Sequence, residues 1–229
     1  MRSLKARVRD EEQMDDPSLD PKVYESVLKG LRRVNAWTFA ARPTLAFLSR
    51  ATRERESFSL LDVGSGEGGM LRTIARWAKR RGLAVRLTGV DLNPKSEGVA
   101  RAITPAAMPI TYRTGDYRDL GRFDFVVSSL VAHHMTDDQL RAFLRWMEAN
   151  SDLGWFVNDL HRHSFAYFGF PLLATLLGVH RIVRQDGQLS IARSFRPGEW
   201  RAILADARVT EGVEVRRYFP FRLCVERLR

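Results

Sequence analysis

The chain has 229 residues, of which 45% are hydrophobic, and this is enough to form one globular domain with a sizeable core. Its single cysteine, Cys224, excludes a disulfide framework and favours a reducing, cytoplasmic setting. The formal net charge of +10 comes from basic residues spread along the whole chain, so it does not by itself indicate nucleic-acid binding.

Residues 1–20 are rich in charged side chains and contain no apolar run of the kind found in a secretory signal peptide. We therefore expect a charged, mobile N-terminal arm, followed by a single domain over residues 21–229. In residues 21–56 apolar side chains recur at helical spacing, which predicts one or two amphipathic helices before the first strand.

Strands and helices alternate in the next part of the chain, up to about residue 162. Gly82 is typical of a helix end, and Thr136 is typical of a helix N-cap. Such alternation predicts a parallel sheet with helices on both faces. We expect strands that begin at Phe58, Ala84, Ile110, Phe123 and Gly154, and helices over 68–82, 96–103 and 136–151.

The pattern changes after residue 162. The apolar stretch 165–179 has helical character, but it is too short to span a bilayer and is interrupted by Pro171. For the remainder we expect a polar loop over 180–195, a helix over 196–207 and two closing strands around Pro220.

The complete pattern predicts one α/β domain built on a doubly wound, mostly parallel, seven-stranded sheet. The N-terminal helices of residues 21–56 precede this sheet. A helical insertion over 161–194 follows the fifth strand, and we expect it to cover a substrate. Ligands of such sheets bind at the carboxyl ends of the strands, so the side chains at the strand exits are the candidates for function.

The stretch LLDVGSGEGGM, which begins at Leu60, runs from an apolar strand into a glycine-rich loop and then into a helix. Its glycines let a ligand come close to the backbone at a helix N-terminus. Gly64, Gly66 and Gly69 also match the G-x-G-x-x-G pattern of dinucleotide-binding proteins. The loop alone therefore leaves open which nucleotide cofactor it holds.

Other features favour a cofactor that is not a dinucleotide. Asp62 stands two residues before the first glycine, where a carboxylate can face the ammonium group of a ligand. Asp116, in the stretch GDY, can accept a hydrogen bond from an adenine amino group. One compact sheet must also provide both the cofactor site and the substrate site. Asp91, about 20 residues past the loop, can accept both ribose hydroxyls of either cofactor and does not decide.

At these strand exits the sequence resembles the class I S-adenosylmethionine-dependent methyltransferases. The motifs of that family occur in order over roughly Leu60 to Leu160, as LLDVGSGEGG, VDLNP, TGDYRDL, FDFVVSSLVAHHM and GWFVNDL. The segment SSLVAHHMTDDQL is most similar to small-molecule enzymes of the quinone-biosynthesis type. The resemblance implies a Rossmann-like methyltransferase fold with S-adenosylmethionine as its cofactor.

The resemblance also implies a role for each cofactor-binding residue. Gly64, Ser65 and Gly66 would lie along the methionine part, with Asp62 near its amino group. Asp91 would bind the ribose hydroxyls. The other predicted contacts are Leu92 on the adenine, Asp116 at its amino group, Tyr117 beside the ring, and Ser129 and Leu130 near the sulfonium. The alternative for the GDY stretch is to stabilise a turn. The alternative for Ser129 and Leu130 is to form part of the wall of the site.

Histidines at the strand exits are the candidates for removing a proton from the acceptor. A phenol has a pKa of about 10, so a neutral histidine within hydrogen-bond reach would assist its methylation. We favour His133 as the general base, with His134 and His161 as further catalytic candidates. Orientation of the loop is the alternative role for these histidines. We expect no metal site.

The insertion over 161–194 carries several phenylalanines and leucines that can line an apolar pocket, although helices that merely pack on the sheet share this pattern. Histidines and arginines that flank it can meet an anionic group or a phospholipid surface. Peripheral membrane contact therefore stays open, as does the oligomeric state. We predict methyl transfer to a small apolar or aromatic acceptor, with O-methylation of a phenolic, polyketide or quinone-like compound as the first choice.

Four alternatives remain at this point. The acceptor atom can be carbon or nitrogen in place of oxygen. An RNA-modifying methyltransferase is the first rival, although we do not expect nucleic acid as a partner because the basic residues form no block. The others are an NAD-linked oxidoreductase and a binding module that keeps the fold without turnover.

Overall fold

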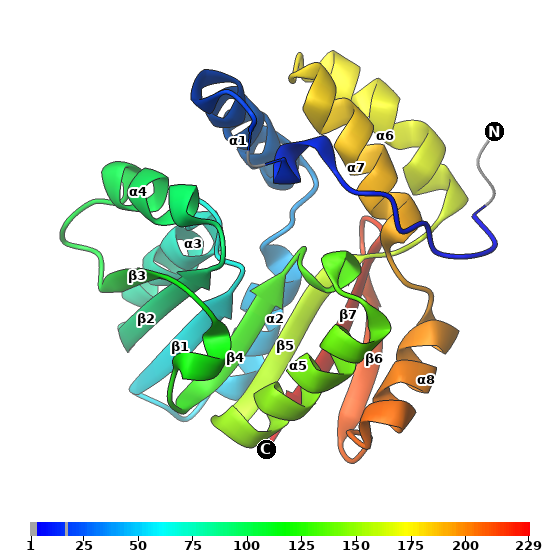
Figure 1. Cartoon of the computed structure of the whole chain (residues 1–229). Coiled ribbons are helices and arrows are strands. Elements are labelled where there is room, and N and C mark those ends of the chain that lie inside the picture. Colours follow the sequence, from blue (N-terminus) through cyan, green and yellow to red (C-terminus); the bar gives the residue numbers. More distant parts are fainter. Residues whose placement is uncertain (1–3, 17) are drawn as a thin grey trace.

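A single sheet runs through the protein, and the computed structural model describes it with its helices over residues 4–16 and 18–229 (Figure 1). Its strands are β1 (Ser57–Val63), β2 (Ala84–Asp91), β3 (Ile110–Thr114), β4 (Phe123–Ser129), β5 (Ser151–Leu160), β6 (Val213–Tyr218) and β7 (Arg222–Leu228). They lie in the order β3-β2-β1-β4-β5-β7-β6. The first five strands are parallel, and β7 pairs antiparallel with both β5 and β6. The predicted doubly wound, mostly parallel, seven-stranded sheet is confirmed.

Helices cover both faces of this sheet. On one face α2 (Arg42–Ala51), α3 (Gly69–Arg80) and α4 (Pro94–Ile103) pack around Phe47, whose ring stacks on Phe156 of β5 at 5.0 Å. On the other face α5 (Asp137–Asn150) and α8 (Pro197–Ala207) pack around Trp155 and Trp200, both fully buried. These two apolar clusters hold the helices against the sheet, and the carboxyl ends of its parallel strands meet along one edge.

Three further helices lie together beyond the carboxyl ends of the parallel strands (Figure 1). They are α1 (Pro21–Trp37), α6 (Ser164–Leu176) and α7 (Arg181–Arg193). Val27 and Val34 of α1 pack against Ile182 and Val183 of α7, and the other side of α7 packs against α6. Within the described part of the chain, no helix combines the length and the apolar character needed to cross a bilayer.

Helix α7 corrects the expectation of a polar loop over 180–195, which is wrong. The side chain of His180 caps this helix, since its Nδ1 accepts a hydrogen bond from the backbone N–H of Ile182 at 3.2 Å. The helix buries Asp186, Ser190 and Arg193 as well as apolar residues. Because polar side chains occupy its inward face, its apolar periodicity is too weak to reveal a helix in the sequence.

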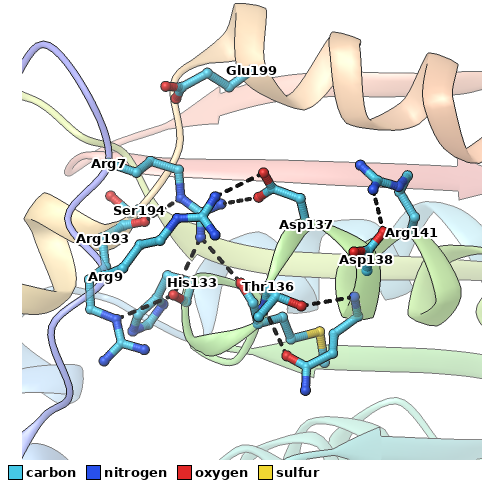
Figure 2. A network of polar contacts seen from close by, with 12 residues as sticks. Arg7, Arg9, His133, Thr136, Asp137, Asp138, Arg141, Arg193, Ser194 and Glu199 are labelled. Atoms are coloured by element: carbon cyan, nitrogen blue, oxygen red, sulfur yellow. Dashed lines mark hydrogen bonds and ion pairs between the residues drawn. The ribbon is translucent and has the colours of Figure 1, made fainter.

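The N-terminal arm lies along α7 and the turn η3 (Ala132–His134), within residues 4–16. The backbone N–H of Val8 donates to the carbonyl of Ala192 at 3.2 Å, and the guanidinium of Arg7 lies over the ring of Phe195 at 3.7 Å. Figure 2 shows Arg7 and Arg9 pointing toward Asp137, with Arg7 Nη1 2.9 Å from Oδ1. Residues 1–3 and 17 of the predicted arm lie outside the described residues, and its mobility stays a prediction.

Candidate active site

The glycine loop connects β1 to α3 with backbone that only glycine adopts easily. Gly64, Gly66 and Gly68 have φ values of +73°, +51° and +76°. A Cβ atom on Gly64 would stand 2.3 Å from Val131, and one on Gly68 would stand 2.1 Å from the hydroxyl of Tyr112. A Cβ on Gly66 would meet nothing within 4 Å, so this glycine faces open space. Packing therefore requires two of the glycines, while the third leaves the backbone open to a ligand.

Asp91 ties the end of β2 to this loop. Its Oδ2 accepts a hydrogen bond from the backbone N–H of Gly66 at 2.8 Å, and its Oδ1 accepts one from the N–H of Asn93 at 2.9 Å. The carbonyl of Val90 accepts from Gly64 and Ser65. A carboxylate has about four acceptor positions, so Asp91 keeps capacity for a ligand hydroxyl after these two bonds.

Asp62 is a buried carboxylate with an unused oxygen. Its residue is 2% exposed, and no described group donates a hydrogen bond to its Oδ1. Burial raises the pKa of Asp62 to about 8, and the negative charge of Asp91 adds to the shift. A ligand cation at this position would supply the missing partner, because a buried acceptor without one is costly.

One cavity of about 1220 Å³ joins this loop to the helices beyond the sheet. Its wall combines polar groups at the strand exits with apolar groups from α1, α6 and the turn between β6 and β7. Such a cavity is large enough for a nucleoside cofactor together with a small acceptor. The residues that line it include Glu12, Asp62, Gly66, Asp91, Leu92, Tyr117, Ser129, Leu130, His133, His134, Phe170, Ser190 and Arg222.

Most of the predicted cofactor residues line this cavity. Leu92 lines the cavity and is 73% exposed. Tyr117 lines the cavity with its ring packed edge-on against Phe143 and Trp146, at 5.0 and 4.9 Å. Leu130 holds a left-handed φ of +62°. Its backbone N–H donates to the carbonyl of Asn158 at 2.9 Å, which fixes the exit of β4.

Asp116 is the predicted cofactor residue that the structure does not place in the cavity wall, although its neighbours Gly115 and Tyr117 line it. Its carboxylate caps the turn η2 (Tyr117–Asp119) and pairs with Arg118, whose Nε lies 2.9 Å from Oδ2. The hydrogen bond with the Arg118 side chain holds the pKa of Asp116 below its usual range. Its predicted contact with adenine therefore competes with a local ion pair.

His133 is held between two carboxylates. It is 3% exposed, its Nδ1 lies 2.7 Å from Asp159 Oδ1, and its backbone N–H donates to Asp159 Oδ2 at 2.9 Å. On the other side of the ring, Nε2 lies 3.6 Å from Glu12 Oε1, too far for a hydrogen bond. Burial lowers the pKa of His133, but Asp159 and then Glu12 outweigh it and raise the pKa to about 9.

The other two histidine candidates differ in position. His134 lines the cavity, and its Nε2 lies 3.7 Å from Glu12 Oε1. His161 does not line it: its backbone pairs with Phe221 and Phe195, and its ring lies beside His163. Burial and the charge of Arg217 lower the pKa of His161 to about 4, so this ring is neutral at physiological pH. The structure thus brings His133 and His134 together and leaves His161 apart.

Glu12, Asp159, Ser190 and Arg193 are site residues that sequence reasoning missed. Ser190 donates to Glu12 Oε1 at 2.8 Å, and Arg193 Nη1 lies 3.6 Å from the same oxygen. Burial raises the pKa of Glu12, but His133, then His134 and the hydrogen bond from Ser190, outweigh it and hold the pKa below its usual range. The only available signal was Asp159, which stands at the exit of β5 directly beside the exit of β4.

Glu12, His133 and His134 also have the ligand types of a metal site, with one ligand atom from each within 4.8 Å of the others. The guanidinium of Arg193 is 3.6 Å from the glutamate oxygen that such an ion would need. A metal ion would therefore have to displace a cation that is already present. The geometry favours an ion-pair cluster at this place.

Comparisons with known proteins agree with this architecture. Residues 60–150 match the family model of a methyltransferase domain. No match was found among curated protein sequences. Among solved structures, magnesium protoporphyrin IX methyltransferase from Synechocystis PCC 6803, crystallised with S-adenosylhomocysteine, has a TM-score of 0.57 and 16% identity. That alignment covers 95% of this chain and 91% of the other.

Two further solved structures have the same fold. The plantazolicin methyltransferase BpumL in complex with S-adenosylhomocysteine has a TM-score of 0.63 and 14% identity, over 92% of each chain. Human N-acetylserotonin methyltransferase in complex with S-adenosylmethionine has a TM-score of 0.62 and 13% identity, over 96% of this chain and 63% of that one.

The fold is thus the Rossmann-like fold of methyltransferases. With the domain match, it supports the prediction that the chain is a class I S-adenosylmethionine-dependent methyltransferase. Neighbours of this fold were crystallised with S-adenosylmethionine or with its product S-adenosylhomocysteine.

The burial of Asp62 predicts a pH-dependent stability. The folded protein holds a proton on Asp62 up to about pH 8, whereas the unfolded chain releases it near pH 4, so the stability of the ligand-free protein falls between these values. Asp62→Asn removes this loss, and we expect it to raise the free energy of unfolding by about 2 kcal/mol near pH 8, with little change near pH 4. Urea unfolding at both pH values measures the difference. Asp138→Asn, at an exposed carboxylate, is the control, and an equal pH dependence of Asp62→Asn and wild type would contradict the assignment.

Proposed function

We propose that the protein transfers the methyl group of S-adenosylmethionine to a hydroxyl oxygen of a small apolar or aromatic acceptor. The observation that carries this proposal is the single cavity that joins the glycine loop, the buried His133 and an apolar helical cover. Cofactor and acceptor can therefore meet in one space without a second domain. Methyl transfer to carbon or nitrogen remains the alternative, as does an RNA acceptor.

The residues at the strand exits fit the cofactor. The unused oxygen of Asp62 suits the ammonium group of its methionine part, which would extend along Gly64, Ser65 and Gly66. The remaining acceptor capacity of Asp91 suits the ribose hydroxyls, and the exposed face of Leu92 suits the adenine. We assign Tyr117 to the ring, Ser129 and Leu130 to the region of the sulfonium, and Asp116 to the adenine amino group once its pair with Arg118 opens.

The bound cofactor supplies an electrophilic methyl group, so the chain must position the acceptor and remove its proton. We assign proton removal to Nε2 of His133, because Asp159 engages Nδ1 and no described group accepts from Nε2. A pKa of about 9 matches a phenol, whose own pKa is about 10. Below that pH most of the imidazole is already protonated, so the neutral fraction carries the reaction. His134 and His161 stay secondary candidates.

The helical insertion supplies the acceptor pocket. Ala166, Phe170 and Leu173 of α6 line the cavity, as do Gly187 and Ile191 of α7. They place an apolar wall opposite the polar strand exits, which suits an aromatic ring with a hydroxyl at one end. The predicted role of residues 161–194 as a substrate cover is consistent with this placement and forms part of the proposal.

Binding of the cofactor product tests the assignment of the cavity. Asp91→Ala removes the acceptor for two ribose hydroxyls, and we expect calorimetric titration to show affinity for S-adenosylhomocysteine about 10- to 100-fold weaker than in wild type. Asp138→Ala, an exposed carboxylate of α5, should bind as wild type does. Unchanged affinity of Asp91→Ala would remove the ribose assignment. Incubation with S-adenosylmethionine and phenols, anilines or RNA, followed by mass spectrometry, then identifies the acceptor, and transfer to RNA alone would overturn the proposed substrate class.

The two carboxylates beside His133 predict a shift in the pH profile. A base with a pKa of about 9 is active only when deprotonated, so kcat/KM should rise with pH and level off above about pH 9. Glu12→Gln removes one of the charges that raise this pKa, and the rise should therefore move to lower pH. Glu11→Gln, an exposed neighbour on the same arm, is the matched control. Superimposable profiles for Glu12→Gln and wild type would rule out the coupling between the arm and the base.

An exposed apolar stripe on α6 supports peripheral contact with a membrane. Phe165, Phe168, Leu172 and Leu176 follow one another at helical spacing and are all at least half exposed. The ring of His163 stacks on Phe165 and on Phe221 of the β6–β7 turn, so the stripe continues toward Phe219 beside it.

The charges around this stripe favour an anionic lipid surface. The sequence has no acidic residue between Asp159 and Asp186, and Arg33 and Arg184 reach the C-terminal end of α6 through Leu177 and Thr175. An apolar face rimmed by cations is typical of helices that lie at the interface of anionic bilayers. We therefore propose that the stripe docks on such a bilayer, beside the cavity that Phe165 also lines.

Vesicle sedimentation tests this docking. Wild type should sediment with phosphatidylglycerol vesicles and more weakly with phosphatidylcholine vesicles. The triple variant Phe168→Ser, Leu172→Ser, Leu176→Ser should lose most of this binding, because it removes exposed apolar surface only. Leu228→Ser, an exposed leucine at the end of β7, is the control. Equal sedimentation of the triple variant and wild type would refute the docking, and a concentration-dependent dimer that the triple variant abolishes would assign the stripe to self-association instead.

A further inference from the structure

Arg222 is a buried cation in the wall of the cavity. It begins β7, where it is paired with Leu160 of β5 and Tyr218 of β6, and it is 2% exposed. The cavity wall continues on either side through Leu160 and Phe221. The guanidinium thus lies at the same end of the cavity as the exit of β5, which carries Asp159.

Its guanidinium has no partner within the described part of the chain. No group there accepts a hydrogen bond from Nη1, and no carboxylate lies within ion-pair distance of the side chain. Asp159 is a carboxylate whose charge acts on Arg222, but its two oxygens already accept from His133 and from the backbone of Leu160. Burial lowers the pKa of Arg222.

Arg162 shows how the same chain treats a buried guanidinium that has only a structural role. It is 1% exposed and donates to the carbonyls of Leu4 and Ser194 and to the carboxylate of Glu199. Each of these bonds offsets the loss of water around the charge. The absence of comparable bonds at Arg222 indicates that its partner comes from outside the described chain.

The other buried charges on this side of the cavity have partners. Glu12 and Asp159 both lie beside His133, and Arg193 lies beside Glu12. The buried carboxylate of Asp186 accepts from the backbone N–H groups of Gln13 and Met14. Arg222 differs, because within the described residues it has neither an ion pair nor an acceptor for Nη1, and it stands next to an apolar pocket.

We propose that Arg222 binds a carboxylate of the acceptor, so that the enzyme acts on a hydroxylated aromatic acid. A carboxylate fits the planar fork of an arginine with two parallel hydrogen bonds, and burial strengthens such a pair. The carboxylate supplies the acceptor that Arg222 lacks, and the ring then lies between Arg222 and His133 along the apolar wall of α6. That this ligand is the methyl acceptor rests on the proposed function. Binding of a carboxylate at Arg222 can nevertheless be measured without turnover.

Titration of the complex with S-adenosylhomocysteine tests the subsite, with salicylate and its hydroxybenzoate isomers compared with phenol. Wild type should bind at least one hydroxybenzoate about 10-fold or more tightly than phenol. Arg222→Met should lose this preference, and Arg222→Lys should keep part of it. Arg217→Met, an exposed arginine of β6, should keep all of it. Equal affinity of wild type for both kinds of ligand, including no measurable binding of either, overturns the proposal.

Unfolding of the ligand-free variants provides the second readout. Arg222→Met removes an unpaired buried charge, so its denaturation midpoint should equal or exceed that of wild type, whereas Arg162→Met should unfold at lower denaturant concentration. A strongly destabilised Arg222→Met would assign the arginine a structural role and overturn the proposal. If acetate competes with hydroxybenzoate in wild type but not in Arg222→Met, the result supports a carboxylate site at Arg222. If hydroxybenzoate binds through Arg222 but no phenol is methylated, the subsite stands and the proposed function fails.

Discussion

The divergence of the chain at the carboxyl ends of β1 and β4 is the constraint on which the site depends. These strands are neighbours, but the chain leaves β1 toward α3 on one face and leaves β4 toward α5 on the other. Two loops that part in this way cannot fill the space between them with their own backbone. The glycine loop and Asp62 therefore lie on one side of a crevice, and His133 lies on the other.

The buried charged groups differ between the two sides of this crevice. Near β1, burial and then the negative charge of Asp91 raise the pKa of Asp62. Near β5, Nη1 of the buried Arg222 has no acceptor among the described residues. A carboxyl oxygen without a donor therefore lies at one end of the cavity, and a guanidinium without an acceptor lies at the other. A cationic cofactor and an anionic acceptor suit its opposite ends, which would orient both reactants before any chemistry occurs.

The sequence allowed the fold, and most of the residues that line the β1 side of the cavity, to be predicted, because both depend on local spacing. A strand that ends in Asp62 and a glycine loop specifies its own turn, and the residues after β2 follow from the same alternation. Ser129 and Leu130 could be placed from the end of β4 alone. Asp116 shows the limit of this reasoning, since Arg118 two residues later pairs with its carboxylate. A pattern of strands and helices does not show which neighbouring side chains pair with one another.

The acceptor side could not be predicted, because its residues meet only through distant parts of the chain. Glu12 and Ser190 are 178 positions apart, and a charged arm gives no sign that one of its carboxylates is buried. The helix that carries Ser190 and Arg193 reads as a polar loop, since it buries polar side chains. Arg222 is one of many arginines in the sequence, and only its position inside the sheet distinguishes it.

The place of β7 inside the sheet has a consequence for how the protein is made. On a ribosome β5 emerges long before β7, so its outer edge remains unpaired while the next 60 or so residues are synthesised. Glu12 likewise meets Ser190 and Arg193 only after α7 has been synthesised. The cavity is therefore completed only after β7 has been synthesised, and a nascent chain that stalls before β7 exposes an apolar strand edge to other chains. Chaperones that shield such edges would then determine how much active enzyme a cell obtains.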